Sequence, residues 1–231
     1  MTIFNFALIR SIRSLPNLIL LLGVSLALVF LPVDGWHALP LGYHFNGILL
    51  LFSASKLVHM IMEDRKNKIM TRIGAAPVTH FNYLSQNLLA FALLLIGQSA
   101  VITFGAWLLH GNVFSSMIQL FTVFSIFSVF SVTAISFSLA WCSLFRQPES
   151  STAAMLGIVM VLALLGGTLL PIQAMPTPLQ KISMTSPIYW LHEGIMLVKG
   201  GSIFAELLTP LGILLLFAIA FILIGSRRRL A

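Results

Sequence analysis

Residues 121–141 read FTVFSIFSVFSVTAISFSLAW, a stretch of apolar and small hydroxyl side chains without a single charge. A helix of about 20 such residues spans the hydrocarbon core of a lipid bilayer. Comparable apolar runs lie on both sides of this stretch, and together they predict an all-α integral membrane protein with six transmembrane helices. The six runs cover residues 17–31, 45–62, 83–109, 117–144, 153–170 and 204–224.

The composition of the whole chain agrees with this fold class. Of the 231 residues, 58% are hydrophobic and 8% are charged, and the mean hydropathy is +1.01. Soluble domains are about half apolar and about a quarter charged, so a soluble enzyme, a nucleic-acid binder and a disordered chain are excluded. Six spans leave only short loops, and we expect a single transmembrane domain over residues 1–231. The apolar amino-terminal run lacks an A-x-A site, so we expect no cleaved signal peptide.

The basic residues, which give the chain its net charge of +7, predict its orientation. Lysine and arginine residues close to spans are retained on the cytoplasmic side of a membrane. If both termini are cytoplasmic, only Lys181 and Lys199 lie outside. We therefore expect a multi-pass protein of the cell membrane with both termini inside. The inner basic residues are then Arg10, Arg13, Arg65, Lys66, Lys68, Arg72, Arg146, Arg227, Arg228 and Arg229.

Two further segments have helical periodicity without being spans. Residues 1–14 carry an apolar face beside Arg10 and Arg13, which predicts an N-terminal interfacial helix along the inner leaflet. Residues 171–201 are apolar although they fall on the outside. Their apolar side chains recur at helical spacing, so we expect one or two short helices that re-enter the outer leaflet. The recurring positions are Ile188, Leu191, Ile195 and Val198.

The sequence carries no catalytic or metal-binding pattern. Because no Gly-Lys dipeptide occurs, the phosphate-binding loop of ATPases is absent, and this chain is not expected to hydrolyse ATP. The HEGIM stretch at 192–196 ends in Met where a zinc protease needs its second His. Gly97-Gln98-Ser99-Ala100 lacks the last Gly of the Gly-x-Ser-Gly motif of rhomboid intramembrane proteases. Cys142 is the single cysteine and has no paired His or carboxylate ligands in the sequence pattern.

Two stretches together resemble the membrane subunit of an ATP-binding-cassette (ABC) exporter of the type-2 permease family. One is EDRKNKIMTRIGAAPVTHFNYLSQNLL at 63–89, with an acidic residue, a basic patch, an amphipathic segment and then Pro77-Val78. The other is GGTLLPIQAMPTPLQKISMTSPIYWLHEGIM at 166–196, with the spaced Gly, Pro and Ile of the family's last extracellular region. The chain departs from the family at Asn67 and Lys68, where Gly-Thr is usual, and at Gln86 or Asn87, where Lys is frequent.

The resemblance implies partners for this chain. A cytoplasmic coupling helix at 63–76 would contact a separate ABC ATPase, present in two copies, which would bind the ATP and Mg²⁺ while this chain binds no cofactor. A second permease copy in a homodimer, or else a related permease in a heterodimer, would complete the assembly in a bacterial inner membrane. The alternative for the charges is that they only anchor the second span. The predicted coupling residues are Glu63, Asp64, Arg65, Lys66, Lys68 and Arg72.

Other candidate residues lie within the spans. Lys56 and His59 share a helix face and line the translocation path, unless Lys56 snorkels to the inner headgroups and His59 makes an ordinary contact with Glu63. In the fourth span, phenylalanines at three-residue steps form one stripe and serines form another beside it. The aromatic stripe would bind cargo, or else the phenylalanines contact lipid and the serines pack helices. The path candidates in this span are Phe124, Phe127 and Ser128. The resemblance puts Ala153 and Gly157 at the dimer interface. The outer gate candidates are Pro171, Pro187, Trp190 and Glu193.

The sequence therefore predicts the membrane-spanning subunit of an ATP-driven exporter. The few charges in the spans favour an amphipathic or hydrophobic cargo such as a drug, an antimicrobial peptide or a lipid. One alternative is a six-span secondary transporter or channel, which needs buried carboxylates near the membrane midplane, whereas all six acidic residues fall in loops or at span ends. Another alternative is a non-transporting membrane assembly subunit.

Overall fold

The computed structural model describes residues 3–31, 40–67, 79–111, 114, 116–201 and 204–227. These residues form helices joined by turns, which confirms the all-α class. Five helices are long and apolar enough to span a membrane, and a sixth span results if the bent pair of segments at the amino terminus counts as one. The elements are α1 (Ile3–Arg13), α2 (Leu15–Leu18), the π-helix η1 (Ile19–Val24), α3 (Ser25–Val29), α4 (Leu41–Lys66), α6 (His80–His110), α7 (Met117–Leu144), α8 (Pro148–Leu165), the 3₁₀-helix η2 (Ile172–Ala174), α9 (Thr177–Ser183), α10 (Pro187–Lys199) and α11 (Phe204–Arg227).

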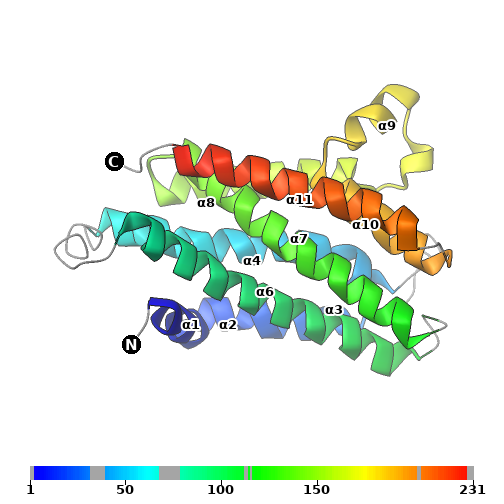
Figure 1. Ribbon diagram of the computed structural model, residues 1–231, viewed down its shortest axis with the longest axis horizontal. Coiled ribbons are helices and arrows are strands. Elements are labelled where there is room, and N and C mark those ends of the chain that lie inside the picture. Colours follow the sequence, from blue (N-terminus) through cyan, green and yellow to red (C-terminus); the bar gives the residue numbers. More distant parts are fainter. Residues whose placement is uncertain are drawn as a thin grey trace.

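Helix α7, which contains the quoted FTVFSIFSVFSVTAISFSLAW stretch, lies at the centre of the bundle and packs against α4, α6, α10 and α11 (Figure 1). Its Phe127 and Phe130 are fully buried. Most of its buried hydroxyl groups donate to a carbonyl oxygen one turn earlier in the same helix, as Ser131 does to Phe127 at 2.8 Å, whereas the buried Ser138 hydroxyl has no hydrogen-bond partner within the described part of the chain. This internal pairing lets most of these small polar residues face other helices at close range in the apolar core.

The first two helical segments meet at a sharp bend of 81° between Ile3–Arg13 and Leu15–Val29. Pro16 explains the break, because a proline ring cannot continue a helix from the preceding turn. Ser14 accordingly has an extended backbone, and the helix restarts at Leu15 with Pro16 in its first turn. Helix α1 packs against the start of α6 and buries Ala7 and Ser11. Its location along the inner leaflet stays a prediction.

One end of the bundle brings together α1, the end of α4, the start of α6, the α7–α8 turn and the last turn of α11 (Figure 1). We call this the basic end, because the inner basic residues named above flank these elements in the sequence. Helix α4 continues without a break to Lys66. Glu63–Lys66, the expected start of a separate coupling helix, is therefore the last turn of α4, and the rest of that expected helix from residue 68 lies outside the described residues.

The chain between α8 and α11 leaves the bundle and returns to it. The apolar run expected over 153–170 is replaced by α8 at Pro148–Leu165, because Pro148 begins the helix and Gly167, with φ of 82°, turns the chain after it. Helix α9 then projects to the side (Figure 1). Helix α10 packs back against α7 and α11. Its predicted apolar face is confirmed, since Ile188, Leu191, Ile195 and Val198 are all buried.

Candidate functional site

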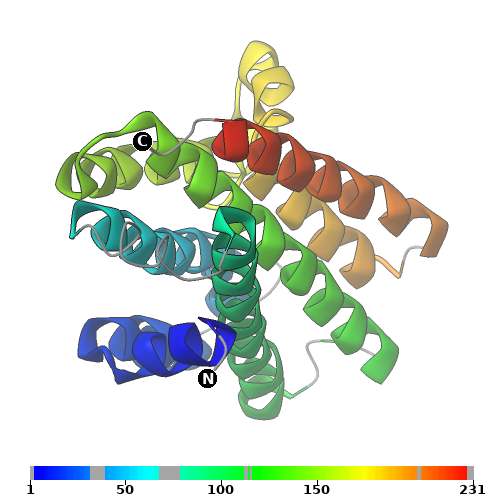
Figure 2. The same ribbon diagram turned by 60° about the vertical axis from the view of Figure 1, so that its left-hand side comes forward.

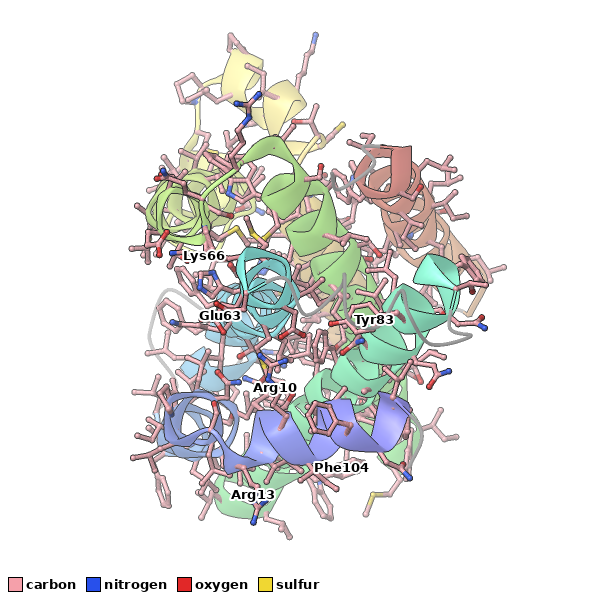
Figure 3. The ribbon with its side chains drawn as sticks, turned by 90° about the vertical axis from the view of Figure 1, so that its left-hand side faces the viewer. Arg10, Arg13, Glu63, Lys66, Tyr83 and Phe104 are labelled. Carbon is pink, nitrogen blue, oxygen red and sulfur yellow. The ribbon has the colours of Figure 1, made fainter. Side chains whose placement is uncertain are left out.

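A carboxylate at the basic end joins three helices. Asp64, in the last turn of α4, accepts hydrogen bonds from Nη1 of Arg10 in α1 at 2.6 and 2.7 Å, and from the Tyr83 hydroxyl in α6 at 2.6 Å. The Asp64 side chain is 6% exposed, whereas that of Arg10 is 31% exposed. Figure 3 shows Arg10 reaching from α1 toward Glu63 and Tyr83, while Arg13 points away. Asp64 thus ties the amino-terminal helix to α4 and α6.

The same turn of α4 also contacts α8. Lys66 forms an ion pair with Glu149 at 2.8 Å, although both side chains are largely exposed. One turn earlier, Nδ1 of His59 lies 3.3 Å from the hydroxyl of Thr152, and its Nε2 lies 3.5 Å from Glu63. The last two turns of α4 therefore contact α1, α6 and α8 at once, so a displacement of this helix end acts on three other elements.

The sequence at the starts of α6 and α8 positions the side chains that contact the end of α4. Thr79 begins α6 by accepting a hydrogen bond from the backbone nitrogen of Asn82, so Tyr83 stands in the first turns of that helix. Helix α8 begins at Pro148, which puts Glu149 in its first turn. A carboxylate there is favoured by the partial positive charge of the helix amino terminus. Both helix starts face the end of α4.

The predicted coupling residues differ in their surroundings. Glu63 and Lys66 are exposed, at 48% and 60% of their side chains, and stand open to a partner. Asp64 is turned inward, so its contribution to a partner contact would pass through Arg10 and Tyr83. Lys68, Arg72 and the side chain of Arg65 lie outside the described residues, and their role stays a prediction.

Sequence reasoning missed four members of this site, namely Arg10, Tyr83, Glu149 and Thr152. The amphipathic pattern of residues 1–14 marked Arg10 as a polar position. It carried no sign that this arginine binds a carboxylate 54 positions later.

Helix α4 presents one uncovered stripe along its length. Figure 2 shows α4 between the α1–α3 segment and α8. The side of α4 that these neighbours leave open contains Lys56 and His59, which share a face as expected. Spacings of three, four and seven residues place all the partly or fully exposed side chains of this stripe on one helix face. They are Leu41, Phe45, Phe52, Lys56, His59 and Glu63.

The aromatic candidates lie elsewhere. Phe127 is fully buried and stacks on Tyr43 of α4, with ring centroids 6.4 Å apart. Phe124 contacts Phe104 of α6 at 5.6 Å, and the Ser128 hydroxyl donates to the carbonyl of Phe124. These contacts are helix packing within a single chain. The structure does not bring them to the α4 stripe, so the two sets of path candidates are separate.

The outer gate candidates gather around the start of α10, apart from Pro171, which precedes η2. Pro187 is buried in the first turn of α10, and Nε1 of Trp190 donates to the carbonyl of Met184 at 2.8 Å. Glu193 is half-buried on the same helix. Beside it, the ring of His192 lies 5.0 Å from that of His44 in α4, a pair that sequence reasoning missed. Within the described residues, no three His, Cys, Asp or Glu side chains converge as a metal site.

The dimer-interface candidates are exposed in the single chain. Ala153 and Gly157 lie on an open face of α8 together with apolar side chains at helical spacing, and a Cβ atom added at Gly157 would meet nothing within 4 Å. The other exposed residues of this face are Leu156, Met160, Val161 and Leu164.

Comparison with known proteins identifies a family that this chain matches. A family model described as ABC-2 family transporter protein matches residues 45–227, from near the start of α4 to the last residue of α11. A search of curated proteins finds no match.

Proposed function

The chain belongs to the ABC-2 family of transporter proteins, a membrane component of ABC transporters, and from this premise we propose that it is the membrane-spanning subunit of an ATP-driven exporter. Two copies of a separate ATPase subunit bind ATP and Mg²⁺ and supply the energy. Two copies of this chain form the translocation path for an amphipathic or hydrophobic cargo, such as a drug, an antimicrobial peptide or a lipid.

The observation that carries this proposal is the linkage at the basic end. An ATPase that closes on ATP must move membrane helices through a cytoplasmic contact. The exposed Glu63 and Lys66 offer such a contact. Movement there reaches α1 and α6 through Asp64, and α8 through Glu149 and Thr152. One push on α4 therefore changes the packing of several spans together, as alternating access requires.

The open stripe of α4 supports a path framed by the first, second and fifth spans. Three of its six side chains are apolar, and the polar ones, Lys56, His59 and Glu63, lie in the half nearer the basic end. Such a surface suits a cargo with an apolar body and a polar group. In the described part of the chain, Asp64 is the one acidic residue among the buried side chains, and it lies at a helix end, so nothing described supports ion coupling at the midplane.

Purification through an affinity tag tests the proposal. An ATPase subunit is expected to co-purify with the wild-type chain from membranes in a stoichiometric amount. The Glu63→Ala, Arg65→Ala double variant is expected to bind at least tenfold less of this subunit, or to change its rate of ATP hydrolysis. Lys181→Ala, an exposed charge change on α9, is the matched control and should retain the ATPase. Purification of wild type without any ATPase would overturn the proposal.

The homodimer is tested at Gly157. In one copy, a leucine at this position meets open space and improves helix propensity, by up to about 1 kcal/mol relative to glycine. Gly157→Leu is therefore expected to leave the single chain folded and to lower the dimer fraction at least tenfold, as measured by single-molecule fluorescence in lipid vesicles. Gly212→Leu, at an equally open glycine of α11, is the control. Equal dimer fractions in the two variants would exclude α8 from the interface.

A further inference from the structure

An apolar groove lies between α6, α7 and α11 at the basic end, on helices other than those of the proposed path. Its volume is about 390 Å³. Side chains from the first three turns of α6, from α7 and from the last turns of α11 form its walls, among them Phe81, Leu88, Ala92, Ile135, Leu139 and Ile222. None of the predicted site residues lines it.

The hydroxyl groups that line the groove already have hydrogen-bond partners within the protein. Three serines line it, and each hydroxyl already donates within its own helix: Ser85 to Asn82 at 3.3 Å, Ser136 to Val132 at 2.8 Å and Ser226 to Leu223 at 3.3 Å. A polar occupant would lose its hydration there without finding partners. A hydrocarbon chain is therefore the kind of ligand that fits this groove.

The depth of the groove matches one lipid leaflet. Phe81–Ala92 covers about 17 Å at a rise of about 1.5 Å per residue. Half of a hydrocarbon core is about 15 Å. The groove thus begins at the basic end and extends to about the middle of the membrane, as an acyl chain of the leaflet on that side does.

The charges around the groove favour an anionic headgroup. Arg146 is exposed directly after α7, and α11 ends at Arg227, followed in the sequence by Arg228 and Arg229. No acidic residue occurs in the sequence segments 79–92, 132–147 or 222–231. Of the acids at the basic end, Asp64 pairs with Arg10 and Glu149 with Lys66, and the more exposed Glu63 lies 3.9 Å from Arg10 and 3.5 Å from His59. Basic residues next to a membrane attract anionic lipids.

We propose that this groove binds an anionic phospholipid of the leaflet at the basic end, with one acyl chain between α6, α7 and α11 and the headgroup on the side of Arg146, which follows α7. The site is independent of the cargo path. A bound lipid there fills the space between three helices.

Native mass spectrometry of the full chain in detergent, after delipidation and addition of phosphatidylglycerol or phosphatidylcholine, tests this site. Wild type is expected to retain phosphatidylglycerol at least tenfold better than phosphatidylcholine. Ala92→Phe, which fills the groove, should lower this retention at least tenfold. Ala220→Phe, at an exposed alanine of α11 outside the groove, should not. Arg146→Gln, which removes the exposed arginine after α7, should lose most of the preference for phosphatidylglycerol.

A second measurement needs no variant. Phosphatidylglycerol with a photoreactive acyl chain is expected to crosslink to residues 81–92, 132–139 and 222–226 in vesicles of one part phosphatidylglycerol to four parts phosphatidylcholine. Crosslinks spread evenly over the lipid-facing surface would overturn the proposal. So would crosslinks between two protein copies at the groove, equal retention of the two lipids by wild type, or equal retention by the two alanine variants.

Discussion

Replacing Arg10 with methionine is expected to destabilise the protein by about 3 kcal/mol, because it leaves the buried carboxylate of Asp64 without its opposite charge. Asp64 would then keep the Tyr83 hydroxyl as its remaining hydrogen-bond donor. Methionine retains most of the apolar stem of arginine, so the loss reports on the charge and not on packing. The amino-terminal helix should also separate from α4 and α6.

Replacing Asp64 instead of Arg10 is expected to destabilise the protein less. In Asp64→Asn, the guanidinium of Arg10 is already about a third exposed and regains water when its partner is lost. The amide oxygen can still accept from Tyr83, so the expected cost is about 1.5–3 kcal/mol, the size of a hydrogen bond to a charged group. The double variant should be more stable than Arg10→Met alone, because it contains no unpaired buried charge.

Reversible unfolding in mixed micelles measures the free energy of unfolding of wild type, Arg10→Met, Asp64→Asn and the double variant. Arg13→Met is the matched control, since this exposed arginine lies one turn further along α1 and its loss should leave the free energy of unfolding nearly unchanged. If Arg10→Met and Arg13→Met had equal stabilities, Asp64 would not be the anchor of the amino-terminal helix.

The second large effect is expected at Gly166, where α8 ends against the start of α10. A Cβ atom at this position would lie 2.6 Å from Cβ of Ile188 and 2.9 Å from the carbonyl oxygen of Leu162. The backbone conformation itself, with φ of −75°, suits any residue. The whole penalty of Gly166→Ala therefore comes from the contact, and we expect about 3 kcal/mol, at the upper end for an overpacked core.

The neighbours of Gly166 have little room to move. Ile188 is branched at Cβ, which restricts its χ1 rotation, and it is buried. The Ser186 hydroxyl donates to the carbonyl of Leu162 at 3.1 Å and holds the start of α10 against α8. Gly166→Ala must push α10 away and break this hydrogen bond. Because the outer gate candidates gather around α10, we also expect transport to fall.

Two variants separate this contact from a general effect of alanine. Gly212→Ala, at an open position of α11, should be neutral or slightly stabilising. In an Ile188→Ala background, which is itself destabilised by the lost core contacts, adding Gly166→Ala should cost little further stability. A Gly166→Ala protein as stable as Gly212→Ala would show that α8 and α10 do not depend on this close approach.

Helix periodicity explains how much of the fold the sequence predicts. The apolar runs predict the all-α class and most of the long helices, because a span must be continuously apolar and this property is local. The same spacing rule correctly marks Ile188, Leu191, Ile195 and Val198 as one buried face. Helix ends are less predictable from hydropathy, as α8 shows. Pro148 and Gly167 bound that helix, although apolar residues continue to Leu170.

The candidate site also has features that the sequence predicts and features that it does not. The sequence by itself determined that charges gather between the second and third spans, and that this chain lacks the loop needed to hydrolyse ATP. The tertiary structure alone decided that Asp64 turns inward to Arg10 and Tyr83 while Glu63 and Lys66 stay exposed. The physical reason is that a residue's face on its own helix follows from 3.6 residues per turn. Its partner on another helix depends on how the two helices pack, and no local pattern encodes that arrangement.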